Sequence, residues 1–242
     1  MHNYDIDLIV KTNTILTIDQ NNTVLSDMAI LIKDGIIIDI IKNQNCEKLF
    51  PNVQTINSED KIVMPGFINT HTHIPMAYFK GMADDLPLEK WLNEYIWPAE
   101  KKNLSPSFVY EASLHGISEL IKNGITFFND SYFFPDETVK ACQEIGIRAT
   151  IGLLDIEVKL NCLKTIENIL ANIKEKIDFA SKNPLIDFSI SPHSVYACSE
   201  QKWKINIDTA HKYNLLIHTH LSESAIEVEN CLKEYGKLLS DF

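Results

Sequence analysis

The chain has 242 residues, 45% of them hydrophobic, enough to bury one large domain or a domain with a smaller companion. Its formal net charge of −11 argues against nucleic acid and acidic membrane surfaces as partners. No apolar run approaches the roughly 20 residues of a membrane span, and the first residues do not resemble a signal peptide, which favours the cytoplasm. The five cysteines form no C-x-x-C pair, so they indicate reduced structural thiols rather than disulfides or a thiolate zinc site.

Residues 1–61 have the pattern of a small β subdomain. Short runs rich in β-branched residues predict strands at 6–10, 15–18, 28–33 and 36–42. The Asp34-Gly35 pair predicts a type I′ hairpin between the last two strands, because glycine tolerates the positive φ angle that this turn needs. Residues 43–52 are polar and contain a proline, which indicates a loop. The segment is too short to close a sandwich or barrel, so we expect it to need partner strands from elsewhere.

From residue 62 onwards, short apolar strands alternate with helices, which is typical of a parallel sheet covered by helices. The expected strands are residues 67–70, 125–129, 148–154, 186–191 and 215–219. Apolar stripes or capping residues predict helices at 110–121, 138–145, 166–177, 199–213 and 225–235. Polar residues follow each strand, where parallel β/α folds and (β/α)₈ barrels build their sites. No nucleotide-binding glycine motif follows any strand.

Four histidines form two H-x-H pairs at predicted strand ends. His71 and His73 lie two residues apart, so on a strand their imidazoles share a face and can reach one ion. Neutral imidazole is the commonest metal ligand in proteins, and zinc accepts nitrogen ligands. His218 and His220 repeat the spacing near the fifth strand, and spacing alone does not choose between them as a third ligand.

In combination, four stretches resemble the amidohydrolase superfamily of metal-dependent hydrolases. They are MPGFINTHTHIPM (64–76), the segment from GMADDLPLEKWL to IWPAE (81–100), SPHSVYACSE (191–200) and HTHLSES (218–224). They are most similar to the branch of 5′-methylthioadenosine/S-adenosylhomocysteine deaminases and related ring chlorohydrolases. The resemblance implies an α/β fold with a (β/α)₈ TIM-type barrel, and an N-terminal β-sandwich-like subdomain completed by C-terminal strands. It also implies one Zn²⁺ per chain, with iron as the alternative metal.

The resemblance divides the chain into residues 1–61, the β subdomain, and residues 62–242, the first five β/α units of the barrel. It makes His71 and His73 metal ligands, and the family pattern H-x-x-E selects His220 as the third. His218 would then line or support the site.

The resemblance also assigns substrate roles. Glu223 would exchange a proton with the ring nitrogen of the substrate while activated water attacks the adjacent carbon. Glu100 matches a glutamate that hydrogen-bonds ribose hydroxyls, and His193 matches a histidine that contacts the substrate.

The resemblance implies a zinc-dependent enzyme, expected in the cytoplasm, that deaminates a 5′-substituted adenosine to the inosine analogue and ammonia. The expected partner is a small nucleoside, with no nucleic acid and no membrane, and homo-oligomerisation stays open. Nucleoside deaminases of this type often place an arginine after the third strand, where it meets the 5′ substituent. Here Arg148 falls at the start of that strand instead, which favours a small 5′ thioether or deoxy group over a charged homocysteine tail. One alternative is hydrolysis of another ring, such as guanine, cytosine or a triazine. The other is a non-catalytic, metal-binding fragment.

Five β/α units are present, whereas a (β/α)₈ barrel has eight. We therefore expect these 242 residues to be the N-terminal part of a longer polypeptide. In the family, a metal-coordinating aspartate takes the proton from the activated water and follows a later strand, and Asp241 cannot replace it. The segment by itself is therefore predicted to be inactive.

Overall fold

The computed structural model describes residues 5–157 and 171–238. The chain divides into two compact units, Met1–Gly66 and Phe67–Phe242. Within the described residues, every helix is too short or too polar to cross a membrane.

The first unit is a five-stranded sheet with one short helix. Its strands follow the order β3-β2-β1-β4, and β4 and β5 pair in parallel with successive parts of β1. The bounds are Leu8–Leu16 (β1), Val24–Lys33 (β2), Ile36–Lys42 (β3), Asn43–Leu49 (α1), Gln54–Asn57 (β4) and Ile62–Val63 (β5). Buried Ile9 and Leu31 of the sheet form a core with Cys46 of α1. Because β5 pairs with β1, residues 62–63 belong to this sheet, although the expected boundary lies before them.

The hairpin expected at Asp34-Gly35 is confirmed. Both residues have positive φ angles, 50° and 75°, and β2 and β3 run antiparallel.

Two other expectations for this unit are wrong. Residues 43–49 form α1 rather than a loop, because Cys46 anchors this polar segment in the core. Residues 6–10 and 15–18 are not separate strands, because β1 continues through Thr12. The fully buried hydroxyl of Thr12 donates a hydrogen bond to the carbonyl of Lys61 at 2.8 Å, which lets a polar residue occupy the strand interior.

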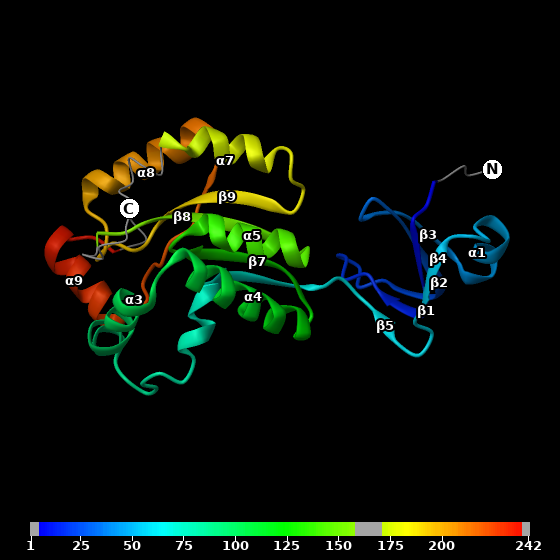
Figure 1. Ribbon diagram of the computed structural model, residues 1–242, viewed down its shortest axis with the longest axis horizontal. Helices are drawn as coiled ribbons and strands as arrows, with labels where there is room; N and C mark the ends of the chain where they lie inside the picture. The colour runs from blue at the N-terminus through cyan, green and yellow to red at the C-terminus, as the bar shows by residue number, and fades with distance from the viewer. Residues whose placement is uncertain (1–4, 158–170, 239–242) are drawn as a thin grey trace. The chain divides into compact units, whose positions relative to one another are not determined.

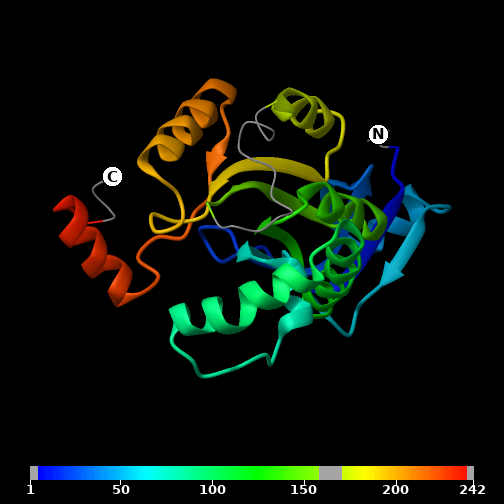
Figure 2. The same cartoon turned by 60° about the vertical axis from the view of Figure 1, so that its left-hand side comes forward.

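The second unit is built on a five-stranded parallel sheet in the order β10-β9-β8-β7-β6, so neighbours in the sheet are consecutive in the sequence. The bounds are Phe67–Thr72 (β6), Ile125–Tyr132 (β7), Arg148–Asp155 (β8), Ile186–Pro192 (β9) and Leu216–Ile217 (β10). The sheet curls (Figure 2), as half of a β/α barrel does. The full set of eight strands and the sandwich-like completion of the first unit stay predictions.

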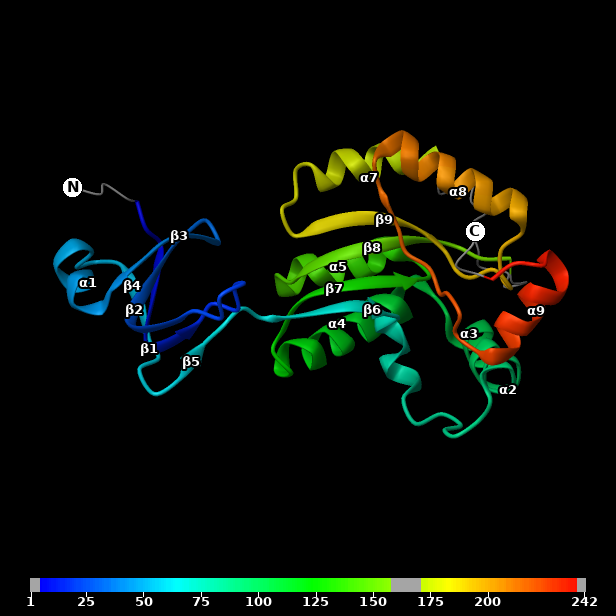
Figure 3. The same ribbon diagram turned by 180° about the vertical axis from the view of Figure 1, so that it is seen from behind.

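Helices pack on the outer face of this sheet. Figure 1 shows α4 and α5 in front of the strands, and Figure 3, seen from behind, shows the strands in front of these two helices. The helix bounds are Pro106–Lys122 (α4), Pro135–Ile145 (α5), Ile173–Ala180 (α7), Glu200–Tyr213 (α8) and Ala225–Tyr235 (α9). The buried core between helices and sheet includes Ile117, Cys142, Ile151 and Phe188. The start of the expected stripe at 166–177 lies outside the described residues.

Four short helices connect β6 to α4, and the sequence pattern did not predict them. They are Ile74–Phe79 (η1), Leu88–Trp91 (α2), Leu92–Ile96 (η2) and Trp97–Asn103 (α3). They bring Trp91, Trp97 and Glu100 into the wall of a cavity that also contains residues from the carboxyl ends of the strands.

Candidate active site

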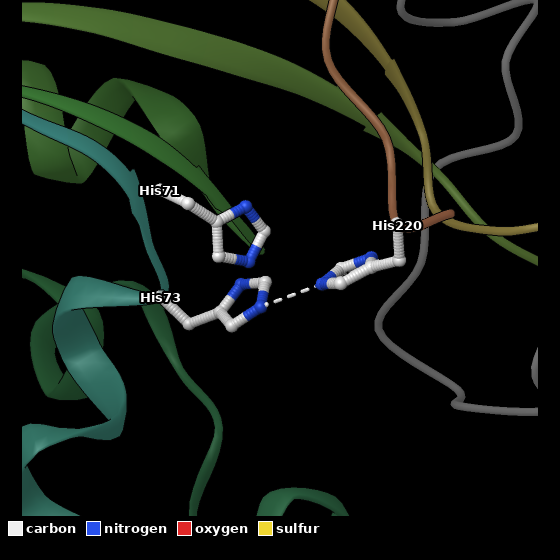
Figure 4. Close-up of side chains that lie close together, drawn as sticks. All are labelled: His71, His73 and His220. Atoms are coloured by element: carbon white, nitrogen blue, oxygen red, sulfur yellow. Dashed lines mark hydrogen bonds between the residues drawn. The ribbon is translucent and has the colours of Figure 1, made fainter. Parts of the chain in front are cut away.

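Three histidine side chains converge at the carboxyl ends of β6 and β10. His71 lies in β6, His73 is the first residue after β6, and His220 lies just beyond β10. One ring nitrogen of each lies within 4.8 Å of the others. Figure 4 shows the rings of His71 and His73 turned towards the ring of His220, which comes from the distant segment. The structure thus brings together the three residues that the sequence analysis selected as metal ligands.

Main-chain carbonyl groups hold two of these rings. Nδ1 of His73 lies 2.6 Å from the carbonyl oxygen of Ser131, and Nδ1 of His220 lies 2.7 Å from that of His193. Because a carbonyl oxygen only accepts hydrogen bonds, each Nδ1 carries a proton and donates it. In the neutral rings, each Nε2 therefore holds an unprotonated lone pair.

These two Nε2 atoms face each other at 3.0 Å. In the neutral rings neither can donate to the other, so a cation between them would turn a repulsive contact into an attractive one. Two nitrogens held at 2.0–2.1 Å by one tetrahedral zinc ion lie about 3.3 Å apart. The donor set of His71, His73 and His220 therefore fits a divalent metal.

Burial favours the neutral forms of His71 and His73. It lowers the pKa of His73 to about 4, despite the opposing hydrogen bond to Ser131. The pKa of His71 is also lowered, first by burial and then by repulsion from His220, while Glu223 opposes the shift. Because a metal binds the neutral imidazole, these rings need not lose a proton to bind one at neutral pH.

A cavity of about 100 Å³ lies beside the histidines. Its polar lining includes Glu100, His193 and Glu223, the three predicted substrate residues, together with His73 and His220. Its walls are mainly apolar or aromatic and include Met76, Trp91, Trp97, Leu154 and Ile156. An apolar cavity with a few convergent polar groups is typical of small-molecule sites.

Glu100 is buried in the cavity wall, with 3% of its surface exposed. The hydroxyl of Tyr132 donates to its Oε1 at 2.7 Å. Burial raises the pKa of Glu100 to about 7, although this hydrogen bond acts in the opposite direction. Glu100 is therefore not an ordinary surface acid. Tyr132 is a site residue that the sequence analysis missed, because no local pattern marks a contact between residues so far apart.

Glu223 is held through both its side chain and its main chain. The hydroxyl of Tyr196 donates to Oε2 of Glu223 at 3.0 Å, and the backbone N–H of Glu223 donates to Oε2 of Glu227 at 2.6 Å. Ser224 caps α9 by accepting a hydrogen bond from the N–H of Glu227 at 3.1 Å. The sequence analysis missed Tyr196 and Glu227. The spacing S-x-x-E, Ser224 to Glu227, is the signal that could have revealed the second.

His193 packs against the ligand set. Its ring centroid lies 4.4 Å from that of His220, and Nδ1 is 3.1 Å from the hydroxyl of Ser194. Burial, reinforced by the neighbouring histidines, lowers its pKa to about 3. A neutral His193 ring therefore lines the cavity next to His220.

A curled parallel sheet of five strands, with polar residues at its carboxyl strand ends, has the arrangement of half a β/α barrel. The model of the amidohydrolase family matches residues 62–241. The 5-methylthioadenosine/S-adenosylhomocysteine deaminase of Thermodesulfovibrio yellowstonii is 39% identical over 231 residues, which cover 95% of this chain and 53% of the relative. The chain therefore belongs to the amidohydrolase family.

Two further comparisons are with deaminases as well. The 5′-deoxyadenosine deaminase of Methanococcus aeolicus is 41% identical over 196 residues, covering 79% of this chain and 44% of the relative. An adenosine deaminase from Xanthomonas campestris, solved with bound zinc, superimposes with a TM-score of 0.91 at 29% identity. That match covers 98% of this chain and 54% of the solved chain. The chain spans about half the length of the curated relatives it matches.

Proposed function

We propose that this chain supplies the metal-binding histidines and a large part of the substrate site of a zinc-dependent deaminase. Its substrates are adenosines with a small 5′ substituent, such as 5′-methylthioadenosine. The observation that carries the proposal is that three histidine nitrogens converge at a cavity containing Glu100, His193 and Glu223. The names of the relatives support the substrate class, and the zinc in the solved adenosine deaminase supports the choice of metal.

A divalent metal held by His71, His73 and His220 would supply Lewis acidity, which generates a nucleophile from water at neutral pH. Attack of the water oxygen on the amidine carbon of adenine places negative charge on the adjacent ring nitrogen. Glu223, as a carboxylic acid, neutralises this charge by giving that nitrogen its proton.

The new carbon–oxygen bond replaces the bond from carbon to the amino group. One proton of the water leaves with the ammonia, and the other restores Glu223. In the family, an aspartate from a later strand takes the first of these protons, so the present segment by itself stays predicted to be inactive.

The other cavity residues bind and orient the substrate. Glu100 accepts hydrogen bonds from the ribose hydroxyls, and Tyr132 fixes the position of its carboxyl group. Trp91 and Trp97 contribute flat apolar walls against the nucleoside. Tyr196 holds the Glu223 carboxyl group, and Glu227 holds the Glu223 main chain.

Replacing Glu223 tests the proposed chemistry. In the full-length protein, Glu223→Gln should lower turnover by about 10²–10⁴-fold, because the proton donor is lost, and leave the bound metal in place. Ammonia release from 5′-methylthioadenosine and elemental analysis of the purified protein measure the two effects. Glu229→Gln, an exposed change on α9, the helix that follows Glu223, is the control and should keep full activity. Full activity of Glu223→Gln would show that the proton comes from another group.

Replacing Glu100 distinguishes nucleosides from free rings as substrates. Glu100→Ala removes the proposed ribose contact, so nucleoside turnover should fall at least tenfold, the cost of losing about 1.4 kcal/mol of binding free energy. If the protein turns over guanine, cytosine or a triazine, that activity should change little. Steady-state assays with 5′-methylthioadenosine and with the free rings provide the comparison. Preferential loss of free-ring turnover would favour the alternative substrate class.

A further inference from the structure

His218 is a further histidine at the site, beside His71, His73, His193 and His220, and the proposed reaction leaves it without a role. Its Nε2 lies 2.8 Å from Nδ1 of His71, and the two ring centroids are 4.9 Å apart. Figure 4 shows the other nitrogen of His71 turned towards His73. The His71 ring is therefore held on one nitrogen by His218 and faces the other two ligands with the opposite one.

This contact differs in kind from those of the other two ligands. Nδ1 of His73 and Nδ1 of His220 each donate to a main-chain carbonyl, which cannot donate in return. The partner of His71 is an imidazole, which can either donate or accept. If His218 donated, a neutral His71 would carry its proton on Nε2 and could not present a lone pair to the shared centre. If His71 donates from Nδ1, its Nε2 lone pair points there.

Strand β9 holds the main chain of His218 on both sides. The N–H of His218 donates to the carbonyl of Ile190 at 2.9 Å, and its carbonyl accepts from the hydroxyl of Ser191 at 2.8 Å. Strand β9 thus holds this residue beside His71. A residue whose main chain is anchored in this way can present its ring to His71 as an acceptor, as groups that orient metal-binding histidines commonly do.

The remaining nitrogen of His218 argues against a purely structural role. Its Nδ1 is buried and has no hydrogen-bond partner among the residues that the structure describes. Leaving a buried polar atom unpaired costs about 1–3 kcal/mol. The hydrogen bond with His71 is the favourable contact that offsets this cost.

We propose that His218 is a positioning residue for the metal centre. It accepts the Nδ1 proton of His71 and so presents the Nε2 lone pair of His71 to the ion shared with His73 and His220. The inference rests on the metal centre of the proposed function, but not on the substrate or the reaction.

Two amides that differ by one methylene group test this role. In His218→Gln the side-chain oxygen can occupy the place of Nε2, whereas in His218→Asn the same amide is too short to reach His71. In the full-length protein, His218→Asn should bind zinc about 10–100-fold more weakly, and His218→Gln should bind it nearly as tightly as the parent. Competition with a chromogenic chelator measures the affinities. His115→Asn, at a half-exposed histidine on α4, is the control.

The tautomer of His71 provides a readout that does not depend on activity. Long-range ¹H–¹⁵N correlation spectra of the zinc-loaded parent should show the proton of His71 on Nδ1, and His218→Asn should reduce that population. Circular dichroism checks that each variant is folded, and His218→Leu repeats the loss of the acceptor without a new polar group.

The outcomes separate the two proposals. The role of His218 is refuted if the Asn and Leu variants bind zinc as tightly as the parent, or if the Gln variant binds it as weakly as the Asn variant. The metal centre would stand in both cases. A parent protein that binds no zinc would overturn the metal centre, and the role of His218 with it.

Discussion

At the scale of single residues, burial sets the chemistry of this site more than any charge partner does. Burial is the largest cause of the shifted pKa values of His73, Glu100 and His193. It moves the pKa of the acid up and those of the histidines down, because in each case the charged form is the one that loses hydration. At all three positions burial therefore favours the uncharged form of the side chain.

Glu100 should make the stability of the protein depend on pH. Burial raises its pKa from 4.5 to about 7, so the folded chain binds the proton more tightly than the unfolded chain. The free energy of unfolding should therefore fall as the pH rises from about 4.5 to about 7, by on the order of 3 kcal/mol. Glu100→Gln should remove this fall.

Urea unfolding at pH 5 and pH 8 measures the effect. The exposed change Glu229→Gln should leave the pH dependence of the parent intact. If Glu100→Gln and the parent lost stability in parallel between these two pH values, the carboxyl group would not be the source of the dependence.

At the scale of elements, regular hydrophobic patterns predicted the strands and helices that form the half-barrel. Strands β6 to β9 begin within a residue of their expected starts, and α5 and α8 end where expected. The helices between β6 and α4 could not be predicted, because tertiary contacts rather than an apolar stripe hold them. The indole N–H of Trp91, for example, donates to the carbonyl of Met82 at 3.1 Å.

The residues of the candidate site also divide into those marked by a local pattern or a family motif and those brought in by tertiary contacts. The paired histidines were found because their spacing is local, and Glu100, His193 and Glu223 through the family resemblance. Tyr132 and Tyr196 were not found, since each reaches its glutamate only after the chain has folded.

The N-terminus of α9 should couple helix stability to the position of Glu223. Ser224→Ala removes the cap and should cost about 1 kcal/mol, but leaves the bond from the Glu223 N–H to Glu227. Glu227→Ala removes that bond but keeps the cap, because the main-chain N–H of residue 227 donates to Ser224. It should therefore lower deamination further than Ser224→Ala does. Thermal unfolding and ammonia release on the full-length protein measure both effects. Equal activities in the two variants would mean that Glu227 does not hold Glu223.

At the scale of the whole molecule, the two edges of the described parallel sheet should govern association. Strands β6 and β10 form these edges, and Ile68 and Leu216 on them are 65% and 76% exposed. Because exposed apolar strand edges promote pairing between chains, the 242-residue chain should self-associate. Leu216→Lys should weaken this association, whereas Leu232→Lys, at an exposed position on α9, should not. Sedimentation velocity over a range of concentrations tests both, and a parent that stays monomeric throughout would contradict the expectation.

The carbonyl groups that orient His73 and His220 have a consequence for how such a site can diverge. Every amino acid carries the same carbonyl, so mutations at positions 131 and 193 can exchange side chains while the backbone goes on orienting the same two imidazoles. Position 193 serves twice, with its oxygen turned to His220 and its imidazole lining the cavity. A change of side chain at position 193 can therefore reshape the cavity while the carbonyl that orients His220 is kept.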